Sequence, residues 1–345
     1  MASNIKEVAR AAGVSTATVS RIINNVGYVK EETRKKVLKA IKELNYTPNA
    51  LARNLSKKET NTVGVIVPDI NNPFFGEVIK GISYVADENN LNIILCDTNE
   101  DVHREIKALQ MLKEQRILGI LAVPTSDIDE INNQYLDLLE STGTQIVLID
   151  RDVKHSNFDG IFIDNIKGAF DATNALIKAG HRKIAIIAGP IDSKTGRDRL
   201  TGYKNSLLFN KLDIIDRYIF IGDFKFESGY KFAKEIFEMK DCPTAILVCN
   251  NLMNLGVIKA VFENQLKIPD DIAIIGFDQT EMFDAVGLKI SVVSNPAMEM
   301  GKNAIELLLK KSLQKEQHST NRLFLTPSLI LKGSERYVPH QHSER

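Results

Sequence analysis

From Thr62 onward, short apolar runs rich in β-branched residues alternate with amphipathic helical stretches. The runs read VGVIVP, NIILCD, ILGILAVP, QIVLID, GIFID, KIAIIAG, YIFIGD, AILVCN, IAIIGFD and ISVVS. Near-continuous apolar strands that alternate with helices are typical of parallel sheets covered on both faces. Ten such runs exceed what one small doubly wound sheet usually holds, so the pattern predicts two α/β lobes, each built on a doubly wound parallel sheet. We expect the first lobe at about 61–161 and 292–323, and the second at about 162–291 and 324–338.

Residues 4–25, NIKEVARAAGVSTATVSRIINN, have the pattern of a helix-turn-helix. Gly13 suits the sharp turn because a residue without Cβ adopts positive φ at no steric cost, and Ser15 stands where the second helix needs an N-cap. Apolar residues recur at helical spacing at Ile5, Val8, Ala9, Val19, Ile22 and Ile23. The other face of the second helix has small side chains and one arginine, which suit a DNA major groove, at Thr16, Ala17, Ser20, Arg21 and Asn24. A plain helical hairpin is the alternative, but it does not require the turn, the cap and the small helix start to coincide.

A third helix is expected after the helix-turn-helix. Acidic residues and Thr33 lead into RKKVLKAIKELNY, and acids in a first helical turn are favoured by the helix dipole. Its apolar stripe is expected at Val37, Leu38, Ile41 and Leu44. Pro48 ends this module, and NALARNLSKKET links it to the rest. The predicted domains are therefore an all-α headpiece at 1–48, a hinge or linker at 49–60, and a core at 61–345.

The formal net charge is zero, but the charges are unevenly distributed. Residues 1–60 contain twelve Lys and Arg against five Asp and Glu, so the rest of the chain has an equal excess of acidic side chains. A basic head on an acidic body predicts a polyanionic partner for the head.

Composition argues against several other classes of protein. Cys96, Cys242 and Cys249 are widely spaced in or beside apolar runs, which predicts core thiols and no disulfide or metal site. His340 and His342 stand in a polar tail that we expect to be disordered. The chain starts without an apolar signal core, and no run approaches the ~18 apolar residues of a spanning helix. We therefore expect a cytoplasmic protein with no membrane association.

Motifs for catalysis are also missing from the sequence. No GxGxxG follows the first strand, no GxxxxGK(S/T) occurs, and no Ser–His or Cys–His pair stands out. The sequence therefore predicts no enzyme and no cofactor. A sugar-binding transport component is a third class: the core suits it, whereas the basic head and the missing signal peptide do not.

Polar and aromatic residues follow many of the predicted strands. In doubly wound sheets ligands bind at the carboxyl ends of the strands. Carboxylates, amides and guanidinium groups satisfy adjacent hydroxyls, and flat rings cover the apolar face of a sugar, so these residues predict a polyhydroxylated ligand. They are Asp69, Asn71, Asn72, Phe74, Phe75, Asp97, Asp150, Arg151, Thr195, Arg197, Arg199, Phe224, Asn250 and Asp278. The alternative for a single Asp or Asn is a helix N-cap, and Asn72 before Pro73 has that pattern.

Taken together, these segments resemble the lactose-repressor (LacI/GalR) family of bacterial transcription regulators. The resemblance runs from about residue 3 to residue 333. It rests on IKEVARAAGVSTATVSRIIN, YVKEETRKKVLKAIKELNYTPNALARNL, VGVIVPDINNPFF, DRLTGY, GDFKFESGY and IIGFD in this order. It implies a DNA-binding headpiece, a hinge helix and a core similar to periplasmic sugar-binding proteins. The implied function is a repressor that binds double-stranded operator DNA and a small-molecule effector.

The resemblance also implies roles in DNA binding. Thr16, Ala17 and Arg21 match base-reading positions, while Ser15, Asn24 and Thr33 match phosphate-contacting positions. Residues 49–55 match a hinge helix that orders on operator DNA. Leu55 would insert between base steps of the minor groove, beside Ala52. Family members work as dimers on near-palindromic sites. The tail GSERYVPHQHSER has no leucine heptads of the kind that make tetramers, so we expect a homodimer.

In the core, Phe74 and Phe75 match the ligand-stacking aromatics of the family. The polar contacts match at Asp150, Arg151, Arg197, Arg199, Phe224, Asn250 and Asp278. The Asp150–Arg151 pair with NNPFF resembles the ribose type of pocket more than the purine type, which favours a monosaccharide such as a pentose. Departures from the family pattern occur at Asn251, Gln279 and Asn295. A global carbon-catabolite regulator with a phosphorylated partner protein is the alternative.

Overall fold

The computed structural model describes residues 4–23, 27–46, 61–154, 157–279, 281–313 and 319–337. The chain forms two compact units, Met1–Thr60 and Asn61–Arg345. The predicted hinge at 49–60 lies outside the described residues, as do six residues that the sequence analysis singled out: Asn24, Pro48, Ala52, Leu55, His340 and His342.

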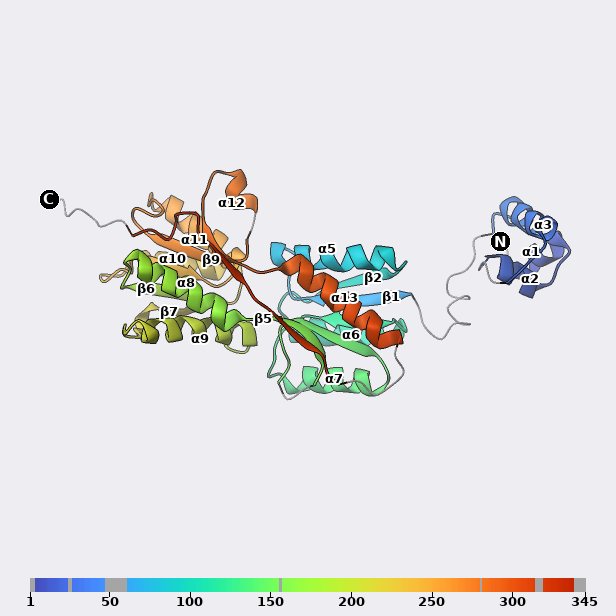
Figure 1. The fold of residues 1–345 in the computed structure, drawn as a ribbon, viewed down its shortest axis with the longest axis horizontal. Helices are drawn as coiled ribbons and strands as arrows, with labels where there is room; N and C mark the ends of the chain where they lie inside the picture. The colour runs from blue at the N-terminus through green and yellow to red at the C-terminus, as the bar shows by residue number, and fades with distance from the viewer. Residues whose placement is uncertain are drawn as a thin grey trace. The chain divides into compact units, whose positions relative to one another are not determined.

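The described residues of the first unit form three helices, α1 (Ile5–Ala12), α2 (Thr16–Ile23) and α3 (Glu31–Glu43) (Figure 1). Asn4 caps α1: its side chain accepts hydrogen bonds from the Lys6 and Glu7 amides, and its own amide donates to the Glu7 carboxylate. Gly13 ends α1 at φ 65°, which confirms the predicted turn. A small core joins the helices, with buried Val8, Ala9, Val19, Ile22, Val37 and Ala40.

The predicted apolar stripe of α3 is wrong at one position. Leu38 is 51% exposed, whereas Ala40 is buried. With 3.6 residues per turn, a face that contains Val37 continues through positions 40, 41 and 44, and position 38 lies beyond its edge.

The first lobe of the second unit contains a six-stranded parallel sheet in the order β11–β5–β4–β3–β1–β2. Its strands are β1 (Thr62–Val67), β2 (Asn92–Asp97), β3 (Gly119–Ala122), β4 (Gln145–Asp150), β5 (Asp159–Ile163) and β11 (Arg322–Leu325). Its helices are α5 (Pro73–Glu88), α6 (Val102–Glu114), α7 (Glu130–Ser141) and α13 (Ala297–Leu313). Alternate strand residues point to opposite faces, so Val65 packs under α5 and α13 and Ile66 under α6 and α7.

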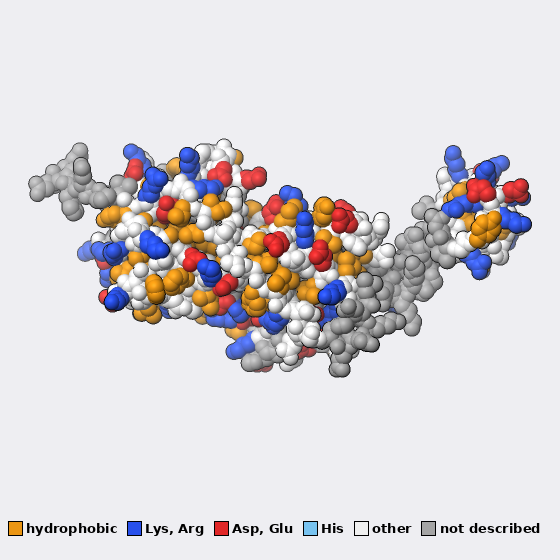
Figure 2. All heavy atoms as spheres, viewed as in Figure 1, with side chains coloured by type: hydrophobic (Ala, Val, Ile, Leu, Met, Phe, Trp, Pro, Cys, Tyr) orange, Lys and Arg blue, Asp and Glu red, His pale blue; other side chains and the backbone are white. Residues whose placement is uncertain are grey.

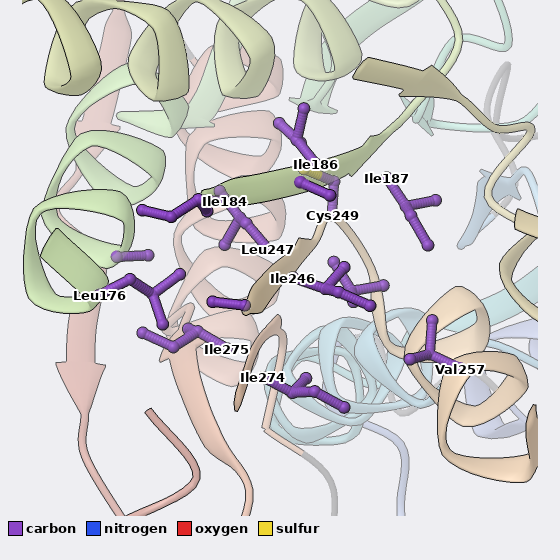
Figure 3. Close-up of a cluster of buried hydrophobic side chains, with 14 of the residues drawn as sticks. Leu176, Ile184, Ile186, Ile187, Ile246, Leu247, Cys249, Val257, Ile274 and Ile275 are labelled. Atoms are coloured by element: carbon purple, nitrogen blue, oxygen red, sulfur yellow. The ribbon is translucent and has the colours of Figure 1, made fainter. Parts of the chain in front are cut away.

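The second lobe contains another six-stranded sheet in the order β12–β10–β9–β8–β6–β7, parallel except at the β10–β12 pair. Its strands are β6 (Ile184–Ala188), β7 (Ile219–Ile221), β8 (Ala245–Val248), β9 (Ala273–Phe277), β10 (Ser291–Ser294) and β12 (Ser328–Ile330). Its helices are α8 (Asn165–Ala179), α9 (Lys194–Phe209), α10 (Phe226–Phe237), α11 (Asn251–Glu263) and the short α12 (Glu281–Ala285). Figure 3 shows how β6, β8 and β9 gather isoleucine, leucine and valine side chains between the covering helices.

All ten predicted strands are present, and the fold is the predicted pair of parallel-sheet lobes. The chain leaves the first lobe after Ile163, returns after Ser294 and leaves again after Leu325, two or three residues later than expected. The boundaries lie later because the strands continue to pair that far: Ile163 still pairs with Leu325, and Ser294 pairs with Ser328.

The cysteines are free, and only Cys249 lies in the core. The prediction of a core thiol is wrong for Cys242, which is exposed because it stands in the turn before β8, and Cys96 is only half-buried. Among the described residues, no group of His, Cys, Asp and Glu side chains has the arrangement of a metal site. No helix in the described ranges combines the length and the apolar character needed to cross a membrane.

Candidate DNA-binding surface and ligand site

The start of α2 is built to present a short polar face. The Ser15 hydroxyl accepts a hydrogen bond from the Thr18 amide at 3.1 Å, which confirms the predicted cap. Val19 is fully buried and anchors the helix on the headpiece core. The side chains of Thr16 and Ala17 are exposed. A capped helix that begins with small exposed residues allows close approach of its first turn to a base edge.

The remaining candidate DNA contacts lie close to that turn. Arg21 is exposed one turn further along α2, where its five donors remain available for a guanine edge or a phosphate. Ser20 is half-buried, as is Thr33 on the first turn of α3. Figure 2 shows several Lys and Arg side chains on the visible face of this unit, which agrees with a surface for a polyanion.

The predicted ligand residues converge on one cavity between the two lobes of the core. Ten residues line it: Asn72, Phe74, Phe75, Asp150, Arg151, Thr195, Arg199, Phe224, Asn250 and Asp278. The first five belong to the first lobe and the other five to the second. The cavity volume is about 20 Å³, so the side chains of the two lobes already meet across it.

The asparagines that line the cavity also cap helices. The Asn72 side chain accepts a hydrogen bond from the Phe74 amide at 3.0 Å, and Pro73 occupies the first turn of α5. The Asn250 side chain caps α11 through the Met253 amide at 2.8 Å and donates to the Phe224 carbonyl at 2.6 Å. The N-cap alternative therefore holds for both asparagines. Capping fixes their position at the cavity edge without removing them from it.

Three cavity residues have strained backbone conformations. Asp150, Phe224 and Asp278 have φ of 61°, 64° and 66°. Non-glycine residues rarely adopt positive φ, and a bulky residue such as phenylalanine does so only where the surrounding fold enforces it. Asp150 is the last residue of β4, whereas Phe224 and Asp278 stand in the loops after β7 and β9. Such strain concentrates at binding sites.

The two cavity arginines are held by fixed partners. Arg151 forms two hydrogen bonds of 2.7 Å with the Glu100 carboxylate, and its Cζ lies 5.3 Å from the centroid of the Phe224 ring in the other lobe. Arg199 donates from Nε to Asn165 at 2.8 Å and lies over Phe277. Their guanidinium groups are therefore oriented before any ligand binds.

The cavity also contains two buried carboxylates. Burial raises the pKa of Asp150, against the opposing effect of Arg199 and Arg151. Burial raises the pKa of Asp278 to about 6, and Arg199 again opposes the shift. Asp150 Oδ1, Thr195 Oγ1 and Arg151 Nε have no hydrogen-bond partner among the described residues. Buried polar atoms are nearly always paired, so these three have capacity for a polar ligand.

Arg197, which the sequence analysis grouped with the ligand contacts, does not line this cavity. Its guanidinium pairs with Asp127 and donates to the Ile191 carbonyl at 2.7 Å. Asp69, Asn71 and Asp97 likewise stabilise the loop after β1: the Asp69 carboxylate accepts from Asn71, and the Asp97 carboxylate accepts from the amide of residue 70.

Known protein families match both units of this chain. Residues 4–49 match the model of bacterial regulatory proteins of the lacI family, and residues 173–334 match a periplasmic binding protein-like domain. The transcriptional regulator RegA of Clostridium saccharobutylicum is 35% identical over 322 residues, which cover 93% of this chain and 96% of that relative. The ribose operon repressor of Haemophilus influenzae is 34% identical, and the match covers 96% of this chain and 98% of that relative. The HTH-type transcriptional repressor PurR of Vibrio atlanticus is 36% identical, and the match covers 96% of this chain and 98% of that relative.

The chain belongs to the LacI family.

The similarity extends to three dimensions. A lac repressor dimer solved with operator DNA and the anti-inducer ONPF superposes with a TM-score of 0.84 at 27% identity, and the match covers 98% of this chain and 100% of the other. As a LacI-family protein, the chain is a DNA-binding transcriptional repressor with a ligand-binding domain, and it is not an enzyme.

The sequence reasoning missed two residues that hold the cavity arginines of this LacI-family repressor, and a third residue outside the cavity. Glu100 and Asn165 orient Arg151 and Arg199, and Asp127 pairs with Arg197 outside the cavity. Asn165 does follow β5 closely, so the strand-end rule had the signal to find it. Glu100 and Asp127 stand several residues beyond their strands, where sequence alone gives no indication of their partners.

Proposed function

We propose that a free monosaccharide, most simply a pentose such as ribose, controls the operator affinity of this repressor by binding between the lobes of the core. Ten of the fourteen residues that the sequence predicts for the ligand line one cavity, and this convergence supports the proposal. They supply the carboxylates, guanidinium groups, amides and rings that a sugar requires.

The unpartnered atoms of the cavity suit hydroxyl groups. Asp150 Oδ1 accepts a hydrogen bond, Arg151 Nε donates one, and the Thr195 hydroxyl does either. Phe74 and Phe75 meet edge to face with centroids 5.1 Å apart and offer apolar surface for the C–H groups of a sugar ring. Because the cavity is small, we expect the lobes to part for entry and to close again around the ligand.

The names of the relatives do not agree on one ligand. They include a ribose operon repressor and several repressors named PurR, and one similar solved structure is a complex of the regulator CelR with cellobiose. The choice of a pentose therefore rests on the residues of this chain, namely Asp150 and Arg151 together with the NNPFF segment.

For operator DNA, we propose base contacts from Thr16, Ala17 and Arg21, phosphate contacts from Ser15, Asn24 and Thr33, and a minor-groove wedge at Leu55 beside Ala52. Ser20 belongs to the polar face of the same helix that would enter the major groove. A homodimer would place two such headpieces on a near-palindromic operator. The similar solved structure of the lac repressor, a dimer bound to operator DNA, supports this arrangement.

Control of DNA binding would then be a shift between two populations. A ligand that favours one arrangement of the lobes changes operator affinity only through its different affinities for the two states.

The test is calorimetric titration of the full-length protein with ribose, other pentoses, hexoses, cellobiose and purine bases. Thr195→Val removes the unpartnered hydroxyl at nearly constant volume, so we expect about tenfold weaker binding of the sugar that binds wild type. Thr201→Val is the matched control, since Thr201 lies on the exposed side of the same helix. Binding of a purine but of no sugar would refute the monosaccharide, and equal effects of both variants would refute the site.

The alternative, a phosphorylated protein as co-effector, has less support. A groove of about 930 Å³ between α5, α12 and α13 contains lysines at 80 and 302 but glutamates at 77, 281, 299 and 306. This excess of negative charge repels a phosphate group. If no sugar binds and a phosphorylated partner protein raises operator affinity, the alternative replaces the proposal.

A further inference from the structure

An ion pair joins the two lobes outside the ligand cavity. Asp127 lies in the loop after β3 of the first lobe, and Arg197 lies on α9 of the second. The Arg197 guanidinium donates to both carboxylate oxygens, at 3.0 Å to Oδ1 and in a shorter contact to Oδ2. The Asp127 side chain is 5% exposed and the Arg197 side chain 37%. A two-pronged, partly buried pair of this kind is stronger and more directional than a single exposed contact.

Backbone contacts reinforce the pair. The Asp127 amide donates across the cleft to the Asp192 carbonyl at 3.3 Å. On its own side, the Asp127 carbonyl accepts from the Lys154 amide at 3.0 Å and from the Asn133 side chain at 3.3 Å. These contacts hold Asp127 in place, and Arg197 also donates to the Ile191 carbonyl at 2.7 Å, so little conformational entropy is lost when the pair forms.

The same loop leads back to the ligand cavity. Arg151 donates to the carbonyls of Pro124 and Thr125 at 3.4 and 3.3 Å. The Thr125 amide donates to the buried Glu105 carboxylate at 2.7 Å. One end of the loop at 124–127 is therefore fixed by a cavity arginine, and the other end carries the carboxylate that reaches the second lobe.

We propose that Asp127 and Arg197 form a clasp that sets how tightly the two lobes close, with Arg151 positioning the loop that bears it. Neither Asp127 nor Arg197 lines the cavity, so both are positioning residues. The clasp itself depends only on the contacts above, whereas its effect on effector affinity rests on the proposed function.

Hydrogen–deuterium exchange of the full-length protein without ligand tests the clasp. We expect Asp127→Asn and Arg197→Gln each to speed exchange about threefold to tenfold in peptides that cover 124–128 and 190–197. The double variant should exchange only slightly faster than either single variant, because both substitutions remove the same interaction. Arg197→Lys keeps the charge but loses the fork, so its effect should be smaller.

Arg322→Gln is the matched control. Arg322 also pairs with an aspartate, Asp152, but within the first lobe, so it should leave exchange at the cleft unchanged. Unchanged exchange in both single variants, additive effects in the double variant, or an equal effect of Arg322→Gln would overturn the clasp. Ribose titration of the same variants forms a separate arm: if ribose fails to bind wild type, the proposed ligand is wrong, and the exchange result still decides the clasp.

Discussion

Two glycines allow helices α5 and α13 to cross in backbone contact, which leads to a sharp prediction about stability. A Cβ added to Gly81 would lie 2.1 Å from the Met298 carbonyl oxygen, and one added to Gly301 would lie 2.0 Å from the Val78 carbonyl oxygen. The helices cover one face of the first sheet side by side (Figure 1). Their contact also fixes α5, whose first turn carries cavity residue Phe74.

The size of the effect follows from these distances. Carbon and carbonyl oxygen approach to about 3.3 Å at closest, so Gly81→Ala or Gly301→Ala must separate the helices by about 1 Å. A backbone carbonyl cannot rotate away as a side chain can. Overpacking costs about 1–3 kcal/mol or more, and the gain in helix propensity from alanine offsets at most about 1 kcal/mol. We expect a net loss of about 1–3 kcal/mol in the free energy of unfolding, or a fall in Tm of about 3–10 °C.

Urea denaturation followed by circular dichroism measures this loss. Gly76→Ala on the same helix is the control, because a Cβ at Gly76 meets no atom within 4 Å. The free energy of unfolding of that variant should be the same as that of wild type or up to about 1 kcal/mol higher. The packing argument is refuted if Gly81→Ala and Gly76→Ala unfold at the same urea concentration.

Three further predictions concern pH, DNA and thiol chemistry. Burial raises the pKa of Asp278 to about 6 from 3.8, so the folded state holds this proton more tightly and its stability falls as pH rises through 6. The free energy of unfolding of Asp278→Asn, measured by urea denaturation relative to wild type, should therefore rise by about 2 kcal/mol between pH 4 and pH 8. The same difference from wild type at both pH values would contradict this. Leu55→Ala should weaken operator binding about tenfold or more in a fluorescence anisotropy titration while sugar affinity stays unchanged; equal losses count against the hinge. Burial raises the pKa of Cys249 to about 12, so alkylation of the native protein at pH 8 should modify exposed Cys242 first, as mass spectrometry can check.

The sequence by itself determined the features that depend on local pattern. Helical spacing, a cap at Ser15 and a turn at Gly13 predicted α1 and α2, and apolar runs predicted ten of the twelve strands found among the described residues. The strand-end rule also found nearly all cavity residues. It works because parallel strands end at a common edge, so residues distant in sequence arrive at one place. β11 and β12 were missed because they are short edge strands with weak burial patterns.

Only the tertiary structure decided what each polar side chain contacts. Asp127 and Arg197 are 70 residues apart, and Arg151 and Glu100 are 51 apart, with no pattern in the sequence that connects either pair. A charged side chain looks the same in the sequence whether it faces a ligand, a carboxylate or water. Its role is fixed by partners within a few ångströms, and those are chosen by how the two lobes pack against each other.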